Sequence, residues 1–450
     1  MMSLAEAAAA VQGRMAGADV RFSGVATDSR SIGRGELFVA IRGERFDGHE
    51  FLGMAKTRGA SAALVDDRFG GRAPLPVVVV DDTRRALGRL GRHWRARFDP
   101  VAIGIAGANG KTTTKEMLAA ILRAHAGETA VLATKGNLNT DIGVPLTVLQ
   151  LGDAHRYCAF ELGMNHPGEI AGLAAIAQPT IAVVTNAQRE HMEFLHSVEA
   201  SAEENANVLR ALPASGIAVV NADDACRPIF LKAAGSRALV DFGLERKAAV
   251  TGGGTLKPLS SEIVVRTAEG VARATLAIPG KHNVRNAIAA AACAHAAGIP
   301  VATIGKGLDA FRPHAGRMQV RHTRGGATVL DDSYNANPDS VRAAIDVLAA
   351  CAAPTVLVLG DMGEVGAQGP QFHREVGAYA RERGIGALYA LGEASRDAVA
   401  AFGKDGRHFD SPEHLQAALP AAATVLVKGS RFMRMERVVA ALTGEGGGTH

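Results

Sequence analysis

Short apolar runs that alternate with helical segments constrain the fold of this chain more than any other sequence feature. They follow one another through the middle of the sequence at Val101–Ala106, Tyr157–Glu161, Thr180–Asn186 and Ile217–Asn221. Strands that are apolar on both faces need cover on both faces, and a parallel sheet between layers of helices provides it. The pattern therefore predicts an α/β fold built around a parallel sheet.

The length and punctuation of the chain predict a division into domains. At 450 residues the chain is too long for one ordinary core, because a domain holds roughly 100–200 residues. Asp99-Pro100 separates a small α/β domain (residues 1–97) from a central domain (98–312) with an antiparallel insert near 249–278, and residues 313–450 predict a Rossmann-like domain. Outside the centre, strands are expected at Leu37–Ile41, Pro76–Val80, Thr355–Leu359, Ala387–Leu391 and Thr424–Val427, and a helix at Arg84–Arg97.

A glycine-rich loop joins the strand Val101–Ala106 to the helical stretch Lys115–His125. Its residues are Gly107, Ala108, Asn109, Gly110, Lys111, Thr112 and Thr113. Glycines let backbone N–H groups approach phosphate oxygens, the lysine can reach the outer phosphates, and the first threonine hydroxyl can ligate Mg²⁺. The loop is shorter than the standard one, so a tight strand-to-helix turn is the alternative. Its setting between a strand and a helix favours a nucleoside triphosphate site.

Polar residues follow two further strands of the predicted sheet. Glu161 ends one strand, and His191 comes shortly after Asn186, which ends the next. The carboxyl ends of parallel strands border the crevice where ligands bind, and Mg²⁺ prefers oxygen ligands beside phosphate. Taken alone, His191 is more typical of a surface or core histidine. Beside Glu161 and the glycine-rich loop it becomes a candidate ligand, so we expect Thr112, Glu161 and His191 to hold Mg²⁺.

The C-terminal region contains two more candidate positions. The turn Asp331–Pro338 places Tyr334 between aspartates and two asparagines, Asn335 and Asn337, ahead of a helix start. An elaborate cap-and-turn would explain the aspartates and asparagines but not the tyrosine, which favours a binding site. Lys428 follows the last predicted strand, where it and a helix N-terminus could meet an anion.

Composition argues against several classes of protein. A net charge of +4 without a Lys/Arg block argues against a nucleic-acid-binding surface. Four cysteines without a CxxC pair indicate neither a zinc site nor a disulfide framework. The apolar residues 1–13 lack a basic start, and no apolar run is long enough to span a membrane. We therefore expect a cytoplasmic protein and, by default, a monomer.

Across all three regions the motifs resemble those of the Mur ligases of peptidoglycan synthesis. In the N-terminal region they are Thr27–Arg30, Gly35–Ala40 and Asp47–Phe51. In the centre they are Gly107–Thr113, Lys135–Thr140, Gly143–Pro145, Glu161–Gly163 and Lys281–Asn283 with Asn286. In the C-terminal region they are Asp332–Pro338, Gly360–Glu364 and Lys428–Met433. The last set resembles the branch that adds D-alanyl-D-alanine, because the Asn-Pro-Arg element of the diaminopimelate- or lysine-adding branch is absent from the sequence.

The resemblance implies a UDP-binding N-terminal domain, a central ATPase domain and an ATP-dependent ligase. ATP would phosphorylate the carboxylate of a UDP-N-acetylmuramoyl-tripeptide, and the amine of D-alanyl-D-alanine would attack the acyl phosphate. Lys111, Glu161 and His191 would be the catalytic residues. It further implies Asn283 at the base, Arg317 at the phosphates and Asp332 at the ribose. The residues expected to bind the two substrates are Ser29, Arg30, Asn137, Asn139, Thr140, Asn335 and Asn337.

One position departs from the family pattern. Many members carry a carbamylated lysine after the histidine motif, which supplies an anionic ligand near a second Mg²⁺, and the matching residue here is Asn205. A neutral amide cannot be carbamylated. Either the second metal is held differently, or Glu203 or Glu204 substitutes for the lysine, and we expect activity without bicarbonate.

Two other functions compete with this interpretation. A nucleotide switch or motor that binds macromolecules would share the glycine-rich loop, but the chain has no basic stripe and has substrate-type domains on both sides of the nucleotide core. A folate polyglutamate ligase would share the loop and the chemistry, but would lack the Asp28–Arg30 and Asp47–His49 segments. Ligases of this plan close around their substrates, and Phe311–Gly316 is the candidate hinge.

Overall fold

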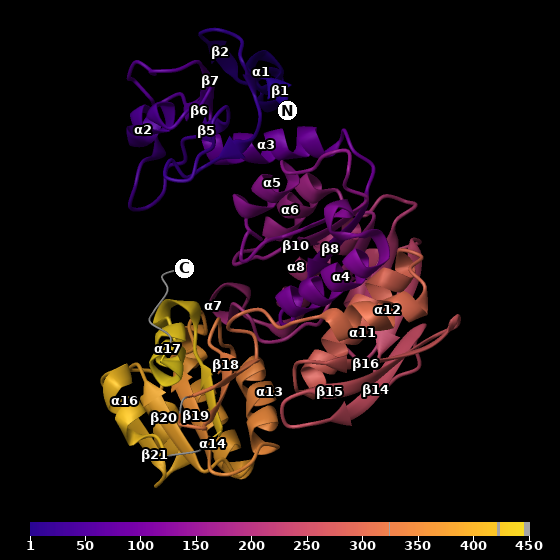
Figure 1. The fold of residues 1–450 in the computed structure, drawn as a ribbon, viewed down its shortest axis with the longest axis vertical. Coiled ribbons are helices and arrows are strands. Elements are labelled where there is room, and N and C mark those ends of the chain that lie inside the picture. Colours follow the sequence, from indigo (N-terminus) through magenta and orange to yellow (C-terminus); the bar gives the residue numbers. More distant parts are fainter. Residues whose placement is uncertain (324, 421–423, 445–450) are drawn as a thin grey trace.

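In the computed structural model, which describes residues 1–323, 325–420 and 424–444, three regions form an open crescent (Figure 1). The N-terminal and C-terminal regions are its two ends. Each region holds one main sheet and its helices, so the predicted α/β class is confirmed. The domain boundaries at residues 97/98 and 312/313 fall between these sheets and stay predictions. Within the described ranges, no helix has the length and apolar character needed to cross a membrane.

The N-terminal region contains a five-stranded sheet in the order β2-β7-β6-β5-β4, parallel except for β2. Its strands are β2 (Arg14–Ala16), β4 (Val25–Ala26), β5 (Leu37–Val39), β6 (Ala62–Asp66) and β7 (Val77–Val80). A short pair, β1 (Met2–Ser3) with β3 (Arg21–Phe22), and the helices α1 (Leu4–Val11) and α2 (Leu52–Thr57) complete it. The two predicted strands correspond to β5 and β7, whereas β6, buried along its whole length, was missed.

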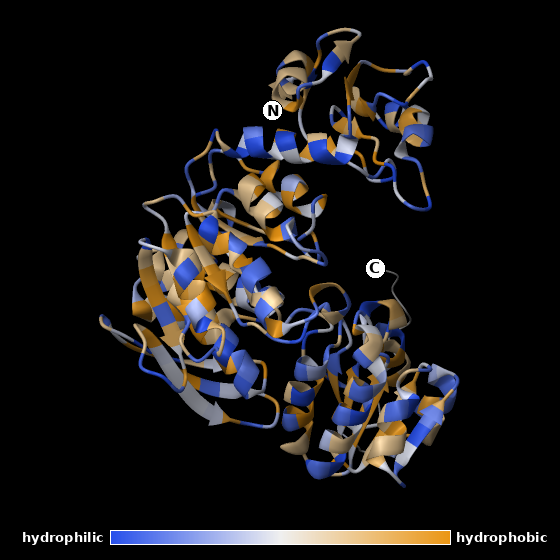
Figure 2. Cartoon of the chain, turned by 180° about the vertical axis from the view of Figure 1, so that it is seen from behind, coloured by the Kyte–Doolittle hydropathy of each residue, from blue (hydrophilic) through white to orange (hydrophobic). Residues whose placement is uncertain are grey.

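Helix α3 (Thr83–Arg95) connects this region to the centre of the molecule. Its N-cap Asp82 accepts a hydrogen bond from the Arg85 N–H at 2.9 Å, which fixes where the helix begins. At its other end Trp94 donates to the Leu151 carbonyl at 3.0 Å, in the central region. Figure 2 shows long hydrophilic stretches on α3 and hydrophobic residues along the central strands. The helix is therefore amphipathic: its polar face is exposed, and Ala86, Leu87, Leu90 and Trp94 on its other face pack into the core.

The central sheet has nine strands in the order β16-β15-β14-β13-β12-β11-β8-β10-β9. They are β8 (Val101–Ala106), β9 (Val131–Ala133), β10 (Tyr157–Glu161), β11 (Ile181–Val184), β12 (Ile217–Asn221), β13 (Ala238–Gly243), β14 (Val250–Leu256), β15 (Ser261–Thr267) and β16 (Gly270–Leu276). All pairings up to β14 are parallel, and β14, β15 and β16 pair antiparallel. The predicted antiparallel insert is thus an extension of the same sheet.

Helices cover both faces of the central sheet, as the apolar runs required. They are α4 (Lys111–Ala126), α5 (Gly143–Val148), α6 (Glu169–Ala177), α7 (Met192–Leu195), α8 (Val198–Asn205), α9 (Asn207–Arg210), α10 (Arg227–Ala234), α11 (Lys281–Ala296) and α12 (Val301–Ala310). Alternate residues of β8 enter different cores: Ile103 and Ile105 pack with α4 and α11, and Ala102 and Ala106 pack with α5 and α6. Because β8 to β13 pair in parallel, their carboxyl ends lie at one edge of the sheet.

The C-terminal sheet has the order β17-β18-β22-β19-β20-β21, with β17 antiparallel and the other strands parallel. The strands are β17 (Gln319–His322), β18 (Thr328–Asp332), β19 (Thr355–Gly360), β20 (Ala387–Leu391), β21 (Gly406–Phe409) and β22 (Thr424–Lys428). Its helices are α13 (Pro338–Ala349), α14 (Gly369–Glu382), α15 (Arg396–Phe402), α16 (Pro412–Ala418) and α17 (Glu436–Thr443). The three predicted strands are β19, β20 and β22.

Candidate active site

The glycine-rich loop lies between β8 and α4, and two of its glycines adopt conformations that other residues avoid. Gly107 has a φ of +127° and Gly110 a φ of +81°. A Cβ at Gly107 would lie 2.2 Å from Thr185 Oγ1, and one at Gly110 would lie 2.2 Å from Asn286 Oδ1. Both positions therefore require glycine. The N-terminus of α4 has no side-chain cap, which leaves its first N–H groups available to an anion.

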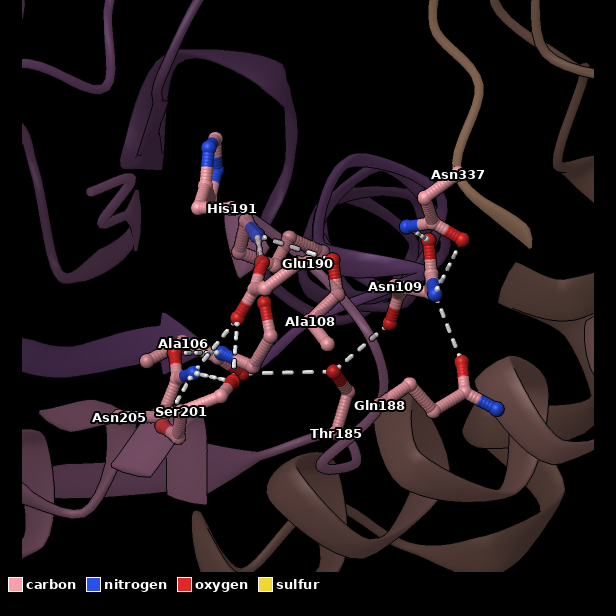
Figure 3. A network of polar contacts seen from close by, with 12 residues as sticks. Ala106, Ala108, Asn109, Thr185, Gln188, Glu190, His191, Ser201, Asn205 and Asn337 are labelled. Atoms are coloured by element: carbon pink, nitrogen blue, oxygen red, sulfur yellow. Dashed lines mark hydrogen bonds and ion pairs between the residues drawn. The ribbon is translucent and has the colours of Figure 1, made fainter. Parts of the chain in front are cut away.

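Residues at the end of β11 fix the loop from one side. Asn186 accepts from the Asn109 N–H at 2.9 Å and donates to the Asn109 carbonyl at 2.8 Å. Thr185 Oγ1 donates to the same carbonyl at 2.8 Å, and the Asn109 side chain donates to Gln188 at 2.7 Å (Figure 3). The loop is thus held in one shape by its neighbours, which lowers the cost of ordering it around a ligand.

Lys111 folds back over the loop that contains it. Its ammonium group donates to the carbonyls of Gly107 and Ala108, the latter at 3.2 Å, and lies 3.4 Å from Glu190 Oε2. Glu190 was not among the predicted residues, although its side chain is only 4% exposed. Its place directly before His191 is the sequence signal that could have found it.

Glu161, at the carboxyl end of β10, meets the loop through Thr112. Its Oε1 accepts from Thr112 Oγ1 at 3.0 Å and from Asn139 Nδ2 at 2.9 Å. Its Oε2 is buried and has no hydrogen-bond partner. A buried carboxylate oxygen without a partner is costly, and a cation would relieve that cost. Glu161 and Thr112 are therefore brought together as the sequence predicted.

His191 precedes α7 in a left-handed conformation with a φ of 46°, which is uncommon for a residue other than glycine. Its Nδ1 lies 2.6 Å from Glu364 Oε2, in the loop after β19. The hydrogen bond from His191 holds the pKa of Glu364 below its ordinary value. Because Nδ1 is engaged with a carboxylate, Nε2 is the ring nitrogen left for a ligand.

The residues expected around the base and the ribose line the same cleft as the loop. Asn283 is buried, and its Nδ2 donates to the Pro279 carbonyl at 2.7 Å. Its Oδ1 accepts from Asn286 Nδ2 at 3.2 Å. Asp332 accepts from Lys428 Nζ at 2.6 Å, across neighbouring strands of the C-terminal sheet. Asn283, the residue expected at the base, thus comes from the central region, and Asp332, the residue expected at the ribose, comes from the C-terminal region.

Arg317 is the predicted phosphate ligand that reaches the loop directly. Its Nη2 donates to Thr112 Oγ1 at 3.2 Å. Its guanidinium lies over the Tyr334 ring, 4.0 Å from the centroid, which limits the orientations available to it. This stacking gives a physical reason for the tyrosine in the turn Asp331–Pro338.

The two asparagines of that turn differ in what they contact. Asn337 caps α13: its Oδ1 accepts from the Ser340 N–H at 2.8 Å in a capping box. Its Nδ2 donates to Asn109 Oδ1 at 2.9 Å (Figure 3). Asn335 Oδ1 accepts from the Ala336 N–H at 2.9 Å. The cap-and-turn alternative thus describes Asn337 well, and contact of either asparagine with a dipeptide stays a prediction.

Asn205 and its acidic neighbours are not placed as expected. Both oxygens of Glu204 accept backbone N–H groups at the start of α6, each at 2.9 Å, and Glu203 pairs with an arginine at the surface. Asn205 Oδ1 instead accepts from the Gly107 N–H at 2.7 Å. Of the two alternatives left open by the sequence, these contacts favour a second metal that is held differently, because Glu203 and Glu204 both have other partners.

Arg189 links the central region to the C-terminal region and was also not predicted from the sequence. Its guanidinium lies 2.6 Å from Asp339 and 2.7 Å from Glu375, on α13 and α14. The hydrogen bonds to Glu375, together with those to Asp339, raise the pKa of Arg189. The loop after β11 is thereby tied to the C-terminal region.

These residues share one cleft with a volume of about 1290 Å³. All three regions contribute to its lining, from Glu44 and Asp82 at the N-terminal end to Lys428 at the other. Asn139 and Thr140, both predicted to bind substrate, line it. The glycine-rich loop of the central region therefore shares one cleft with residues of the N-terminal and C-terminal regions.

Three residues predicted to bind substrate lie outside the lining of that cleft: Ser29, Arg30 and Asn137. Ser29 is buried, with its hydroxyl 3.4 Å from Met54 Sδ, and the exposed Arg30 pairs with Asp28 at 2.8 Å. Asn137 is exposed. Their roles stay predictions.

Three family models match the chain in order. They are the Mur ligase family catalytic domain over residues 21–95, the Mur ligase middle domain over 105–294, and the Mur ligase glutamate ligase domain over 316–431. A UDP-N-acetylmuramoyl-tripeptide--D-alanyl-D-alanine ligase of Escherichia coli (strain K12) is 38% identical, over 97% of this chain and 97% of its own. The chain belongs to the Mur ligase family. The resemblance seen in the sequence is confirmed.

Further relatives of this Mur ligase agree with that assignment. A ligase of Bacillus subtilis (strain 168) with the same name is 34% identical over 92% of each chain. The crystal structure of MurF from Acinetobacter baumannii matches with a TM-score of 0.90 at 32% identity, covering 98% of this chain and 99% of that one. MurF from Thermotoga maritima, solved in complex with ADP, matches with a TM-score of 0.81 at 25% identity, covering 94% and 97%.

Proposed function

We propose that this Mur ligase joins the amine of D-alanyl-D-alanine to the tripeptide carboxylate of a UDP-N-acetylmuramoyl-tripeptide, with hydrolysis of ATP to ADP. The names of its relatives in Escherichia coli and Bacillus subtilis support these substrates. The observation that carries the proposal is the single cleft, in which a phosphate loop lies between walls from the two other regions. Such a cleft can bring three substrates together.

The reaction requires an activated carboxylate. A carboxylate oxygen attacks the γ-phosphorus of ATP, ADP leaves, and an acyl phosphate forms. The amine then attacks the acyl carbon, and the tetrahedral intermediate expels phosphate as the amide bond forms. Lys111 and the uncapped N–H groups of α4 would stabilise charge on the transferring phosphoryl group.

A magnesium ion fits the residues on the acidic side of the loop. Glu161 Oε2 is buried without a partner, the Thr112 hydroxyl is next to it, and His191 has Nε2 free of the contact with Glu364. Among the described residues, no three His, Cys, Asp or Glu side chains are grouped as a metal site, so phosphate oxygens would complete the coordination. When bound, the ion would neutralise charge on the transferring phosphoryl group.

The remaining assignments rest on the resemblance to the Mur ligase family. We place Asn283 at the base, Asp332 at the ribose and Arg317 at the phosphates, and the dipeptide near Asn335 and Asn337. The residues proposed to bind the UDP-linked substrate are Ser29, Arg30, Asn137, Asn139 and Thr140. Since Ser29 and Arg30 lie outside the cleft lining, closure of the crescent or a long substrate has to connect them to it.

Phosphate release from ATP, measured with the two substrates added singly and together, tests the proposal. Release that requires both the UDP-N-acetylmuramoyl-tripeptide and D-alanyl-D-alanine is the expected result. Release with neither substrate, or stimulation by a macromolecule, would leave a nucleotide site but contradict the ligase activity.

A further inference from the structure

A buried carboxylate outside the predicted catalytic set lies against the phosphate loop. Glu190 sits between β11 and α7, with its side chain 4% exposed. Its Oε1 accepts from Ser201 Oγ at 2.9 Å and from Asn205 Nδ2 at 2.8 Å, both on α8. Figure 3 shows these two side chains converging on it. Burying a carboxylate is unfavourable unless it is paired and hydrogen-bonded, and these contacts meet both conditions together with Lys111.

The contacts close into a ring around the first residue of the loop. Lys111 Nζ lies 3.4 Å from Glu190 Oε2 and also donates to the Gly107 carbonyl. The Gly107 N–H donates to Asn205 Oδ1 at 2.7 Å, and Asn205 Nδ2 donates back to Glu190. Each member thus fixes the next. Asn205 binds the loop backbone and the carboxylate at once, so movement of either one disturbs the other.

We propose that Glu190 is a positioning residue that aims the Lys111 ammonium group at the transferring phosphoryl group. A lysine side chain is a flexible point charge with many rotamers, and the carboxylate, itself held by Ser201 and Asn205, restricts where that charge can lie. The inference rests on the proposed ligase function. It adds a residue that touches neither substrate nor metal in the assignment above, and it gives Asn205 a role that needs no modification.

Glu190→Gln tests the proposal, because the amide keeps the shape of the side chain and removes its charge. We expect kcat to fall by about 10- to 100-fold, since misplacing a catalytic group by about an ångström can cost up to about 100-fold. The KM for D-alanyl-D-alanine should stay unchanged, because nothing at that end of the cleft is altered. Glu190→Asp should recover part of the activity, and the melting temperatures of both variants should stay close to that of the unaltered protein.

Glu199→Gln is the matched control, because Glu199 is an exposed glutamate in the first turn of α8. It should leave kcat unchanged. A kcat of Glu190→Gln equal to that of the unaltered enzyme would overturn the proposal. So would equal losses in Glu190→Gln and Glu190→Asp with lowered melting temperatures, since that pattern describes a purely structural role.

Ser201→Ala decides the question if Glu190→Gln does not fold. It removes one hydrogen bond to Glu190 and should lower kcat by a smaller factor, whereas an unchanged kcat would overturn the proposal. The unaltered enzyme is assayed in parallel. If it makes no ligated product, the proposed function has failed; if it does, and Glu190→Gln matches it, the positioning role alone has failed.

Discussion

Two strand-to-helix turns that line the cleft are built in opposite ways. The turn from β8 to α4 leaves the helix N-terminus without a side-chain cap, whereas the turn from β18 to α13 ends in a capping box formed by Asn337 and Ser340. The two are joined where Asn337 Nδ2 donates to Asn109 Oδ1. The turn between a parallel strand and the next helix can therefore leave the helix N-terminus open to an anion or close it with a side-chain cap.

The difference lies in which groups satisfy the helix N–H donors. A capped helix has its first donors engaged by side chains and offers little to a ligand. An uncapped one keeps its donors and its partial positive charge for an anion, at some cost in stability when the ligand is absent. This contrast predicts that changes at the α4 turn affect activity more than stability, and that changes at the α13 turn affect stability more than activity.

Closing the open turn should have the largest effect. Gly110→Ala introduces a Cβ that would lie 2.2 Å from Asn286 Oδ1 at a φ of +81°. The loop must shift, so we expect activity to fall at least ~100-fold, the order seen when a charge-stabilising donor is lost. Gly53→Ala, in α2 with no neighbouring atom within 4 Å of the added Cβ, should leave activity unchanged. Full activity in Gly110→Ala would break the comparison.

Removing the unpartnered carboxylate should have the next largest effect. Glu161→Gln replaces the buried Oε2 with an amide that binds cations poorly. We expect half-maximal activity to require at least ~10-fold more Mg²⁺, and chelation of Mg²⁺ to abolish activity in the unaltered enzyme. A Mg²⁺ titration of both proteins measures this. Overlapping titration curves would show that Glu161 does not hold the ion.

Opening the capped turn should act mainly on stability. Asn337→Ala removes the cap, which costs ~0.5–2 kcal/mol in the free energy of unfolding. Asn337→Asp keeps an acceptor for the Ser340 N–H and should retain most of that stability while losing the donor to Asn109. Denaturant unfolding separates the two variants. The proposed contact of Asn337 with the dipeptide is tested in the same two variants, because it requires the KM for D-alanyl-D-alanine to rise in both. A loss of kcat without a loss of stability in Asn337→Ala would break the contrast between the turns.

The ion pair between Arg189 of the central region and Glu375 of the C-terminal region predicts that stability depends on pH. The hydrogen bond from Arg189 holds the pKa of Glu375 below its ordinary value of 4.5. A carboxyl group with a lowered folded-state pKa stabilises the protein above its unfolded pKa, and that contribution is lost as the pH falls through the folded pKa. The difference in melting temperature between the unaltered protein and Glu375→Gln should therefore be present at neutral pH and shrink below about pH 4.5.

Glu382→Gln, an exposed residue at the end of α14, is the control for that experiment. Its difference in melting temperature should be small at every pH. A difference for Glu375→Gln that is constant with pH would contradict a lowered pKa of Glu375 in the folded protein.

The smallest expected effect is that of bicarbonate. Asn205 is held by Gly107, Ser201 and Glu190 and offers no amine for carbamylation. We therefore expect the same rate in buffer stripped of CO₂ as in buffer with added bicarbonate. Loss of activity on stripping, with recovery on addition, would show that another group near the loop is modified.

The sequence predicted those features of the molecule that local patterns encode. The longer apolar strands β8, β10, β11 and β12 of the central sheet were recognised, and the glycine-rich loop was placed correctly between β8 and α4. The strand β9 was missed because it has only three residues, and β6 was missed because it begins with two alanines, which are uncommon in strands. The antiparallel extension was recognised, but not that it belongs to the central sheet, since pairing between β13 and β14 is not a local property.

The site was predictable where residues follow strand ends, and not where partners lie far apart in the chain. Glu161 and Thr112 were predicted and meet as expected. Glu190 was not, because its significance depends on Lys111 and on Asn205, 79 and 15 positions away. The same holds for Arg189, whose partners Asp339 and Glu375 lie on C-terminal helices.

Transfer of oxygen from the carboxylate to phosphate tests the ligase account most directly. The carboxylate of the UDP-N-acetylmuramoyl-tripeptide that is to be joined is labelled with ¹⁸O. One labelled oxygen becomes the bridging oxygen of the acyl phosphate and leaves with the inorganic phosphate when the amide bond forms. Mass spectrometry of the inorganic phosphate released in the presence of ATP and D-alanyl-D-alanine should therefore find one ¹⁸O for each amide bond formed. Unlabelled phosphate released alongside the amide product would contradict activation of the carboxylate by ATP.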